Sequence, residues 1–202
     1  MNVLAAPLRM TAEEFEKLSD TTGLELLDGR LKGKNIGTES GAISSRMAYF
    51  LWSVVLPAEL GEVMDGDGTY RCFPNRPNQV RKPDVSFIRK ERLPNGEVPR
   101  GITNVRPDLA VEVVSPNDEY DLVDEKVADY YSVGVPLVWV VSPATRTVLV
   151  YLPDGTVRRL TEADELTAGP VIPGFRVTVA HLFPKRAAPA AAPPHEPLAP
   201  AE

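Results

Sequence analysis

One carboxylate interrupts an apolar run in the middle of the sequence. Residues 109–114 read LAVEVV, which is typical of a strand buried on both faces, and Glu112 is the only charged residue in the run. Side chains alternate along a strand, so Glu112 shares its face with Ala110 and Val114. A buried carboxylate without a partner is strongly destabilising. Glu112 therefore needs a cationic partner or a role in a functional site.

A second carboxylate lies at the start of the preceding predicted strand. Asp84 follows Pro83 and opens the segment DVSFI. If this strand lies beside the strand of Glu112, the two carboxylates converge, and they repel each other unless a cation lies between them. Mg²⁺ suits that position because it takes oxygen ligands and usually keeps waters and a substrate phosphate, and Mn²⁺ is an alternative. Asp84 and Glu112 are therefore candidate metal ligands for phosphate chemistry.

A lysine on the following helix is the third candidate. Residues 121–133 predict a helix, with Gly134 just after its end. Lys126 borders its apolar stripe through an i, i+4 relation to Leu122 and Tyr130. Near a bound metal, such a lysine could orient the attacking water, take its proton if the lysine pKa is depressed, or offset charge in the transition state.

Each of these three residues also has a simpler structural interpretation. Asp84 could cap a strand, Glu112 could form an ion pair with Lys126, and Lys126 could extend along the helix edge towards solvent. Taken together at the ends of consecutive elements, however, they favour a functional site. A serine hydrolase using Ser115 is a weaker alternative, because the sequence has no G-x-S-x-G motif and offers only His181 and His195 as bases.

The elements that must position these residues follow from periodicity and turn signals. The order favours an α/β or α+β fold with a mixed sheet. The expected elements are a short helix opened by a Thr11–Glu14 capping box, a hairpin at residues 24–34, a buried helix at 42–56, strands within 61–73, 83–90 and 107–115, the helix at 121–133, a meander over 136–160 and a closing segment at 174–183.

Length and composition predict one domain at residues 1–186. The chain has 202 residues and 43% apolar content, which suffices for one substantial core. Residues 187–202 contain seven Ala and five Pro and predict a disordered tail. The single cysteine, Cys72, excludes an internal disulfide and argues against zinc. No signal peptide or membrane span is recognisable, so we expect a cytoplasmic protein without membrane contact.

The charge is distributed unevenly along the chain. The formal net charge is -6, yet residues 71–106 contain nine basic and three acidic residues, a formal +6 that leaves -12 for the remainder. The basic side chains could be scattered over solvated loops, or they could form a local surface for phosphate groups. The overall charge therefore does not exclude a nucleic-acid partner.

The motifs taken together resemble a known family. RKPDVSFI, PDLAVEVVSPND, DEKVADYYSVGVPLVWVVSP and PGFRV, in this order, are similar to the Uma-type endonucleases of the PD-(D/E)XK restriction-endonuclease-like superfamily. The resemblance runs from about residue 10 to 183. It implies a restriction-endonuclease-like mixed central β-sheet flanked by helices, with an extra N-terminal β-hairpin.

The resemblance also implies roles for individual residues. The Pro-Asp and acidic positions of the motif correspond to Pro83-Asp84 and Glu112, while the usual lysine position holds Val114. In such families the lysine is found on the following helix, where Lys126 fits. A further acidic residue is expected near the first core helix, and Glu25 is the first choice over Glu39.

The implied function is a Mg²⁺-dependent endonuclease that hydrolyses DNA. Restriction-type folds often act as homodimers, because a symmetric pair can cut both strands of a duplex. The alternative is a catalytically weak or inactive module with the same fold, which binds nucleic acid or another protein.

Overall fold

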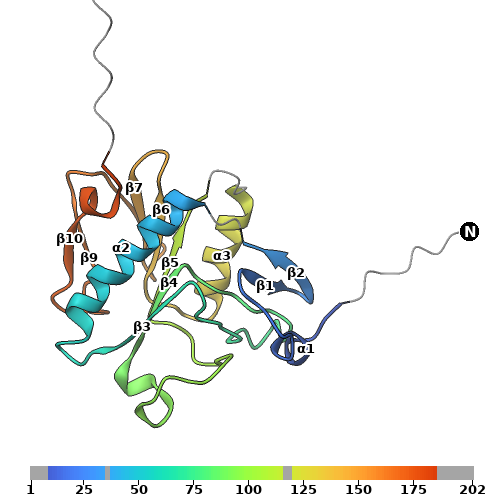
Figure 1. The fold of residues 1–202 in the computed structure, drawn as a ribbon. Coiled ribbons are helices and arrows are strands. Elements are labelled where there is room, and N and C mark those ends of the chain that lie inside the picture. The colour runs from blue at the N-terminus through green and yellow to red at the C-terminus, as the bar shows by residue number, and fades with distance from the viewer. Residues whose placement is uncertain (1–8, 35–36, 116–119, 186–202) are drawn as a thin grey trace, which may run out of the picture.

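The computed structural model describes residues 9–34, 37–115 and 120–185 (Figure 1). The predicted tail at residues 187–202 lies outside these ranges. Within them, no helix has the length and apolar character needed to cross a membrane.

A six-stranded mixed sheet forms the centre of the fold. Its spatial order is β3-β4-β5-β6-β7-β8, and every neighbouring pair is antiparallel except β5 and β6, which are parallel. Helix α3 (Tyr120–Ser132) connects the parallel pair, as a parallel crossover requires. The predicted mixed sheet is confirmed. The strands are β3 (Gly61–Asp65), β4 (Val85–Arg89), β5 (Leu109–Val113), β6 (Val138–Ser142), β7 (Thr147–Tyr151) and β8 (Val157–Leu160).

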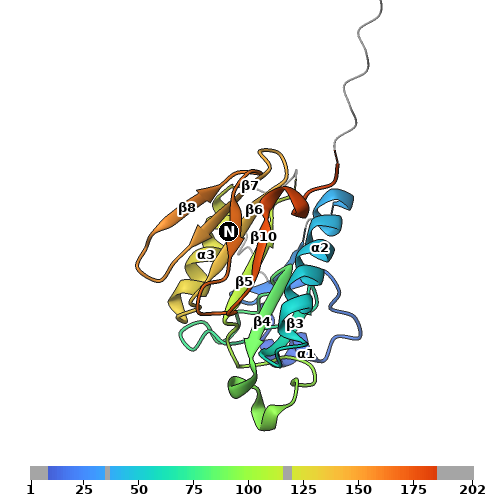
Figure 2. The same ribbon diagram turned by 90° about the vertical axis from the view of Figure 1, so that its left-hand side faces the viewer.

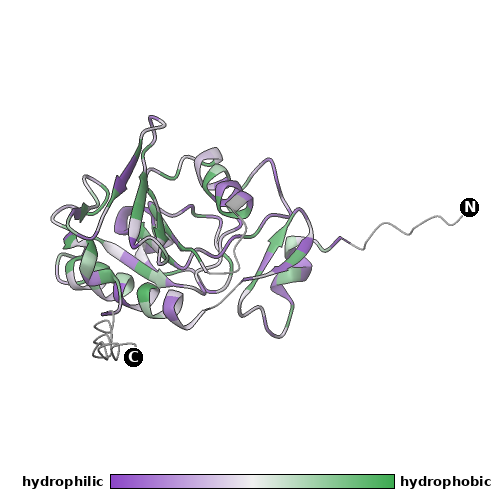
Figure 3. Ribbon diagram, turned by 90° about the horizontal axis from the view of Figure 1, so that it is seen from above, coloured by the Kyte–Doolittle hydropathy of each residue, from purple (hydrophilic) through white to green (hydrophobic). Residues whose placement is uncertain are grey.

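Two helices cover opposite faces of this sheet, as Figure 2 shows. Helix α2 (Thr38–Val55) packs its buried stripe on the face that carries Leu109 and Val111, while α3 packs on the face that carries Ala110. The alternation predicted for β5 is therefore confirmed. Figure 3 shows the matching hydropathy pattern, with apolar central strands and helices that alternate between apolar and polar bands.

An N-terminal unit lies beyond the end of α3 (Figure 1). The predicted capping box opens α1 (Ala12–Glu16), and β1 (Leu24–Leu27) pairs with β2 (Arg30–Gly33) in the predicted hairpin. Its turn has positive φ at Asp28 (47°) and Gly29 (83°), which suits the Asp-Gly sequence. Leu26 also exchanges backbone hydrogen bonds with Val80, and these bonds attach the hairpin to the loop before β4.

The structure extends the sequence prediction at two places. Helix α2 begins at Thr38, four residues before the predicted start at 42, because Ser40 caps the Gly37 backbone and compensates for poor helix formers. The closing segment is a small unit rather than a single strand. It consists of β9 (Glu165–Thr167), which was not predicted, β10 (Arg176–Thr178) and the 3-10 helix η3 (Val179–Leu182), while η1 (Lys90–Arg92) and η2 (Pro94–Gly96) follow β4.

Two glycines provide a test of how β3 docks on β4. Gly61 has φ +151°, and a Cβ there would lie 2.1 Å from the Ile88 carbonyl oxygen, whereas a Cβ on the helical Gly41 would meet nothing within 4 Å. Gly61→Ala should therefore destabilise the protein by about 2 kcal/mol or more. Gly41→Ala should stabilise it by about 0.5–1 kcal/mol. Urea denaturation measures both, and equal free energies of unfolding for the two variants would contradict the predicted β3–β4 approach.

Candidate active site

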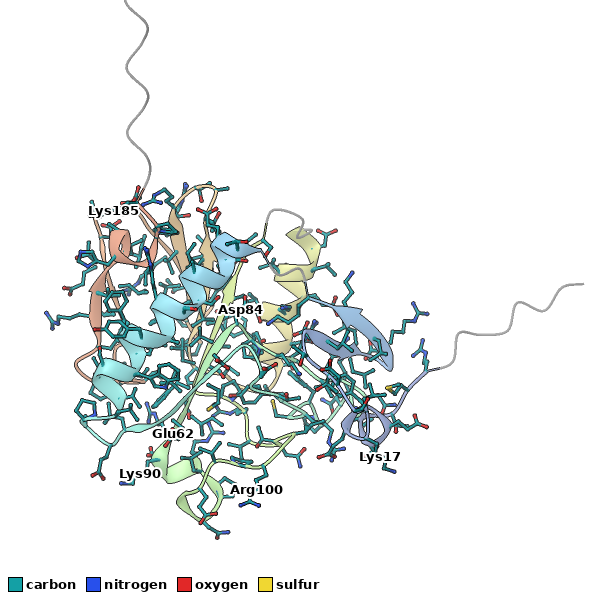
Figure 4. The ribbon with its side chains drawn as sticks, viewed as in Figure 1. Lys17, Glu62, Asp84, Lys90, Arg100 and Lys185 are labelled. Carbon is teal, nitrogen blue, oxygen red and sulfur yellow. The ribbon has the colours of Figure 1, made fainter. Side chains whose placement is uncertain are left out.

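Asp84 lies at the end of the β4–β5 ladder. Its backbone N–H donates to the Val111 carbonyl (2.9 Å), and its Oδ2 accepts a hydrogen bond from the Val113 N–H (2.7 Å). The side chain thus supplies the acceptor for Val113 N–H at the point where the backbone ladder between β4 and β5 ends. This confirms that the strands of Asp84 and Glu112 are adjacent. Figure 4 shows Asp84 in the middle of the molecule.

Glu112 projects from β5 towards α3 and is 4% exposed. Its Oε2 lies 2.7 Å from Lys126 Nζ, and its Oε1 accepts a hydrogen bond from the Tyr130 hydroxyl (2.6 Å). Lys126 and Tyr130 are four residues apart on one face of α3, so both reach the same carboxylate. The predicted grouping of Glu112 with Lys126 is confirmed, and so is the simpler interpretation that the two residues form an ion pair.

Glu25 enters the same site from the hairpin. Its Oε1 accepts a hydrogen bond from the Lys82 N–H (2.8 Å), and its Oε2 lies 3.6 Å from Lys126 Nζ. Lys126 therefore lies between two carboxylates. The alternative acidic residue, Glu39, is exposed in the first turn of α2 and does not line the pocket that holds the other candidates.

These side chains line one pocket. The pocket opens to solvent, and its cavity volume is about 50 Å³. The pocket is lined by Glu25, Leu27, Lys32, Gly33, Lys34, Arg81, Asp84, Glu112, Val113, Val114, Leu122, Val123 and Lys126.

Sequence reasoning missed Lys34, whose Nζ lies 2.7 Å from Asp84 Oδ1 and donates to the Lys82 carbonyl (2.8 Å). The hairpin nevertheless contains a pattern from which the position of Lys34 could have been predicted. Lys32 pairs with Glu25 in the β1–β2 register, and the alternation of side chains places Lys34 on the same face as Lys32.

A buried arginine was also missed. Arg81 lies behind Glu25, at 3.5 Å from its Oε2, and donates through Nε to Asp129 Oδ2 (2.6 Å). Asp129 also accepts hydrogen bonds from Gln79 (2.6 Å) and Arg76. The network connects the base of the site to α3, and no periodicity in the sequence predicts it.

The ionisation of these groups reflects their burial and mutual contacts. Burial raises the pKa of Glu112, and the charge of Lys126 acts in the opposite direction. Burial alone would lower the pKa of Lys126, but the carboxylates of Glu112, Glu25 and Asp84 outweigh it and raise that pKa. The direction of this pKa shift favours the ammonium form of Lys126 at neutral pH.

The donor set fits a hydrated hard cation. Asp84 and Glu112 offer carboxylate oxygens in one pocket, and Mg²⁺ is commonly held by one or two carboxylates together with waters and substrate phosphates. Among the described residues, no group of three or more His, Cys, Asp or Glu side chains is arranged to hold a metal. A site built from this pair would therefore depend on water and phosphate oxygens for its remaining ligands.

The two neighbouring tyrosines of α3 have different partners. The Tyr130 hydroxyl donates to Glu112, whereas the Tyr131 hydroxyl donates to the Leu152 carbonyl (2.8 Å). Ser115 lies 3.0 Å from the Ser40 hydroxyl, and His181 stacks on Phe50, so the serine hydrolase gains no support. His195 lies outside the described residues.

Of the two interpretations left open for residues 71–106, the centre of the segment does not support a single basic surface. Arg81 and Lys82 are buried, and Arg76 binds Asp28 and Asp129. Lys90 and Arg100 lie well away from Asp84 in Figure 4. Ion pairs with acidic residues from other parts of the chain neutralise much of the positive charge that was counted along residues 71–106.

Comparison with known proteins identifies the family of this chain. The family model Uma2, described as "Putative restriction endonuclease", matches residues 12–180. A crystal structure described as "a putative nuclease belonging to DUF820", from Anabaena variabilis ATCC 29413, superposes with a TM-score of 0.75 at 23% identity, over 86% of this chain and 97% of that chain. No curated protein sequence matches this chain. The solved structure confirms the nuclease-like fold, and the family model covers both strands of the site together with α3 and the hairpin. The chain therefore belongs to the Uma2 family of putative restriction endonucleases.

Proposed function

We propose that the protein is a metal-dependent endonuclease that hydrolyses phosphodiester bonds in DNA. The observation that carries this proposal is the convergence of Asp84 and Glu112 in one pocket, with Lys126 in contact with Glu112. Family membership and the nuclease-like fold support the same reaction class.

Each side chain has a role that follows from its position. Asp84 and Glu112 would hold Mg²⁺, or Mn²⁺ in its place, and Glu25 would assist through water or by keeping Lys126 in position. When bound, the metal would supply a water of lowered pKa and neutralise charge on the phosphate oxygens. Lys126, held as an ammonium, would donate a hydrogen bond to the attacking water or to a phosphate oxygen and offset the charge of the transition state.

The proposed substrate is duplex or structured DNA, and the proposed active form is a homodimer. Two copies related by a twofold axis would present two pockets to the two strands of a duplex. Exposed cations outside the paired centre of residues 71–106 would contact phosphates and position the duplex without reading its sequence.

Substitution of the pocket residues should abolish cleavage. Asp84→Asn, Glu112→Gln and Lys126→Met should each reduce nicking of plasmid DNA with Mg²⁺ by about 100-fold or more, because each removes a ligand or the donor. Glu62→Gln is the matched control, since Glu62 lies away from Asp84 in Figure 4 and should retain wild-type activity. Residual activity equal to the wild type in all three pocket variants would overturn the assignment.

Substitution of two neighbouring tyrosines distinguishes a role in positioning Glu112 from a role in stability alone. Tyr130→Phe leaves the buried Glu112 Oε1 without the Tyr130 donor, which should cost about 1–3 kcal/mol of stability and also slow cleavage. Tyr131→Phe removes only the bond to the Leu152 carbonyl and should cost about 1 kcal/mol without slowing cleavage. Thermal unfolding and plasmid nicking measure the two effects. The proposed role of Tyr130 fails if both variants cleave at the same rate.

A specific observation favours a second function, that of a non-catalytic nuclease-fold module. Both oxygens of Asp84 and both oxygens of Glu112 already interact with protein donors, so the site is electrostatically satisfied without a cation. Such a module would bind DNA or a protein partner without cutting.

Calorimetric titration with Mn²⁺ in the presence of a short DNA duplex discriminates between the two functions. The nuclease should bind the ion, and the double variant Asp84→Asn/Glu112→Gln should not, because it lacks both charged ligands. Binding that is absent in the wild type, or equal in both proteins, would favour the non-catalytic module.

A further inference from the structure

Lys34 occupies an unusual position at the edge of the site. Its ammonium contacts Asp84 Oδ1 at 2.7 Å and the Lys82 carbonyl at 2.8 Å, and its side chain is only 9% exposed. Its backbone N–H donates to the Gly23 carbonyl (2.8 Å), which closes the hairpin and fixes the start of the side chain. The lysine is therefore held in place by main-chain contacts at both of its ends.

The ion pair between Lys34 and Asp84 forms a wall between two cavities. One is the site pocket, and the other is a groove that runs along α2 and includes Gly41, Ser44 and Trp52. Lys34 and Asp84 are the two residues that line both cavities. Asp84 Oδ1, which forms part of this wall, is thus already paired with the Lys34 ammonium.

Protein cations already offset much of the carboxylate charge of the pocket. Three carboxylates line it together with four cationic side chains, of which Lys32 is exposed and Arg81 also pairs with Asp129 outside the pocket. A divalent cation at Asp84 would lie within a few ångströms of the Lys34 ammonium. Like charges at such separations strongly disfavour each other in a partly buried site.

We propose that Lys34 is a positioning residue of the metal site, the internal counter-ion of Asp84 that a divalent cation must displace. This inference rests on the proposed function, because it takes Asp84 as a metal ligand. Lys34 holds the Asp84 carboxylate in position at the pocket, and it lowers the affinity of the free protein for metal. The Lys82 carbonyl gives the displaced ammonium an acceptor close to its original position.

One consequence is that metal and substrate bind together. A phosphodiester brings negative charge into the pocket, so it offsets the repulsion between the metal and Lys34. Metal affinity should therefore be low in the free protein and higher with DNA. Without the Lys34 charge, the carboxylates would instead bind the metal more tightly on their own.

The test is calorimetric titration of the full chain with Mn²⁺ in the absence of DNA. Lys34→Met should bind Mn²⁺ about tenfold or more tightly than the wild type, because it removes the competing charge. Lys34→Arg should remain close to the wild type, because the charge is kept. Lys32→Met is a comparison variant in the same hairpin segment, at the mouth of the pocket. It keeps Asp84 and Lys34 paired but removes a charge at the pocket mouth, so Lys90→Met is added as the control outside the pocket. Lys90 is exposed and lies well away from Asp84 in Figure 4, and its substitution should change the affinity by less than about threefold.

The outcomes separate this inference from the proposed function. Lys34→Met affinity equal to or weaker than the wild type overturns the role of Lys34, even if the wild type cleaves DNA with Mg²⁺. A gain in affinity in a protein that never cleaves supports the role of Lys34 and counts against the nuclease. A purely structural lysine would lower the melting temperature of Lys34→Met in EDTA and leave Mn²⁺ affinity unchanged, which also overturns the inference.

Discussion

The buried ion pair between Glu112 and Lys126 is the interaction on which the rest of the site depends. Glu112 is almost completely enclosed between β5 and α3, so its charge is tolerable only with a close partner. Removing one member of such a pair typically costs about 3–5 kcal/mol. The pair therefore fixes the rotation of α3 on the sheet, and Tyr130, one turn along the helix, is brought to the same carboxylate.

The convergence of Asp84 and Glu112 could be predicted because it depends on short-range rules. Alternation within β5 gave the face of Glu112, and the adjacency of the two strands, which the prediction took as its condition, was supplied by the structure. Lys126 followed from helical spacing. Glu25 came from the family resemblance, since the hairpin that carries it reaches the site through the long-range bridge between Leu26 and Val80, which local patterns do not encode.

The remaining parts of the site depend on which side chains meet across the fold. Arg81 and Asp129 are 48 residues apart, and each would be assigned to the surface from its type alone. The same limitation explains the basic segment, where positive residues counted in sequence are neutralised in space by Asp28, Asp108 and Asp129. A charge count along the chain therefore overestimated the surface available for phosphates. The early start of α2 and the strand β9 were missed for a simpler reason, because both are short and weakly patterned.

The hydrogen bonds of the site also bear on how the stability of the fold relates to the proposed reaction. A structural zinc site requires its ion in order to fold, because its ligands repel or lack partners without it. Here every carboxylate oxygen of Asp84 and Glu112 has a protein donor, so protein groups alone pair these oxygens. Stability and the proposed catalysis therefore place different demands on the same residues, because Glu112 and Lys126 also join β5 to α3. Membership in the family is consistent with the fold, and under the proposed function the charge balance around Asp84 sets how readily a metal enters the site.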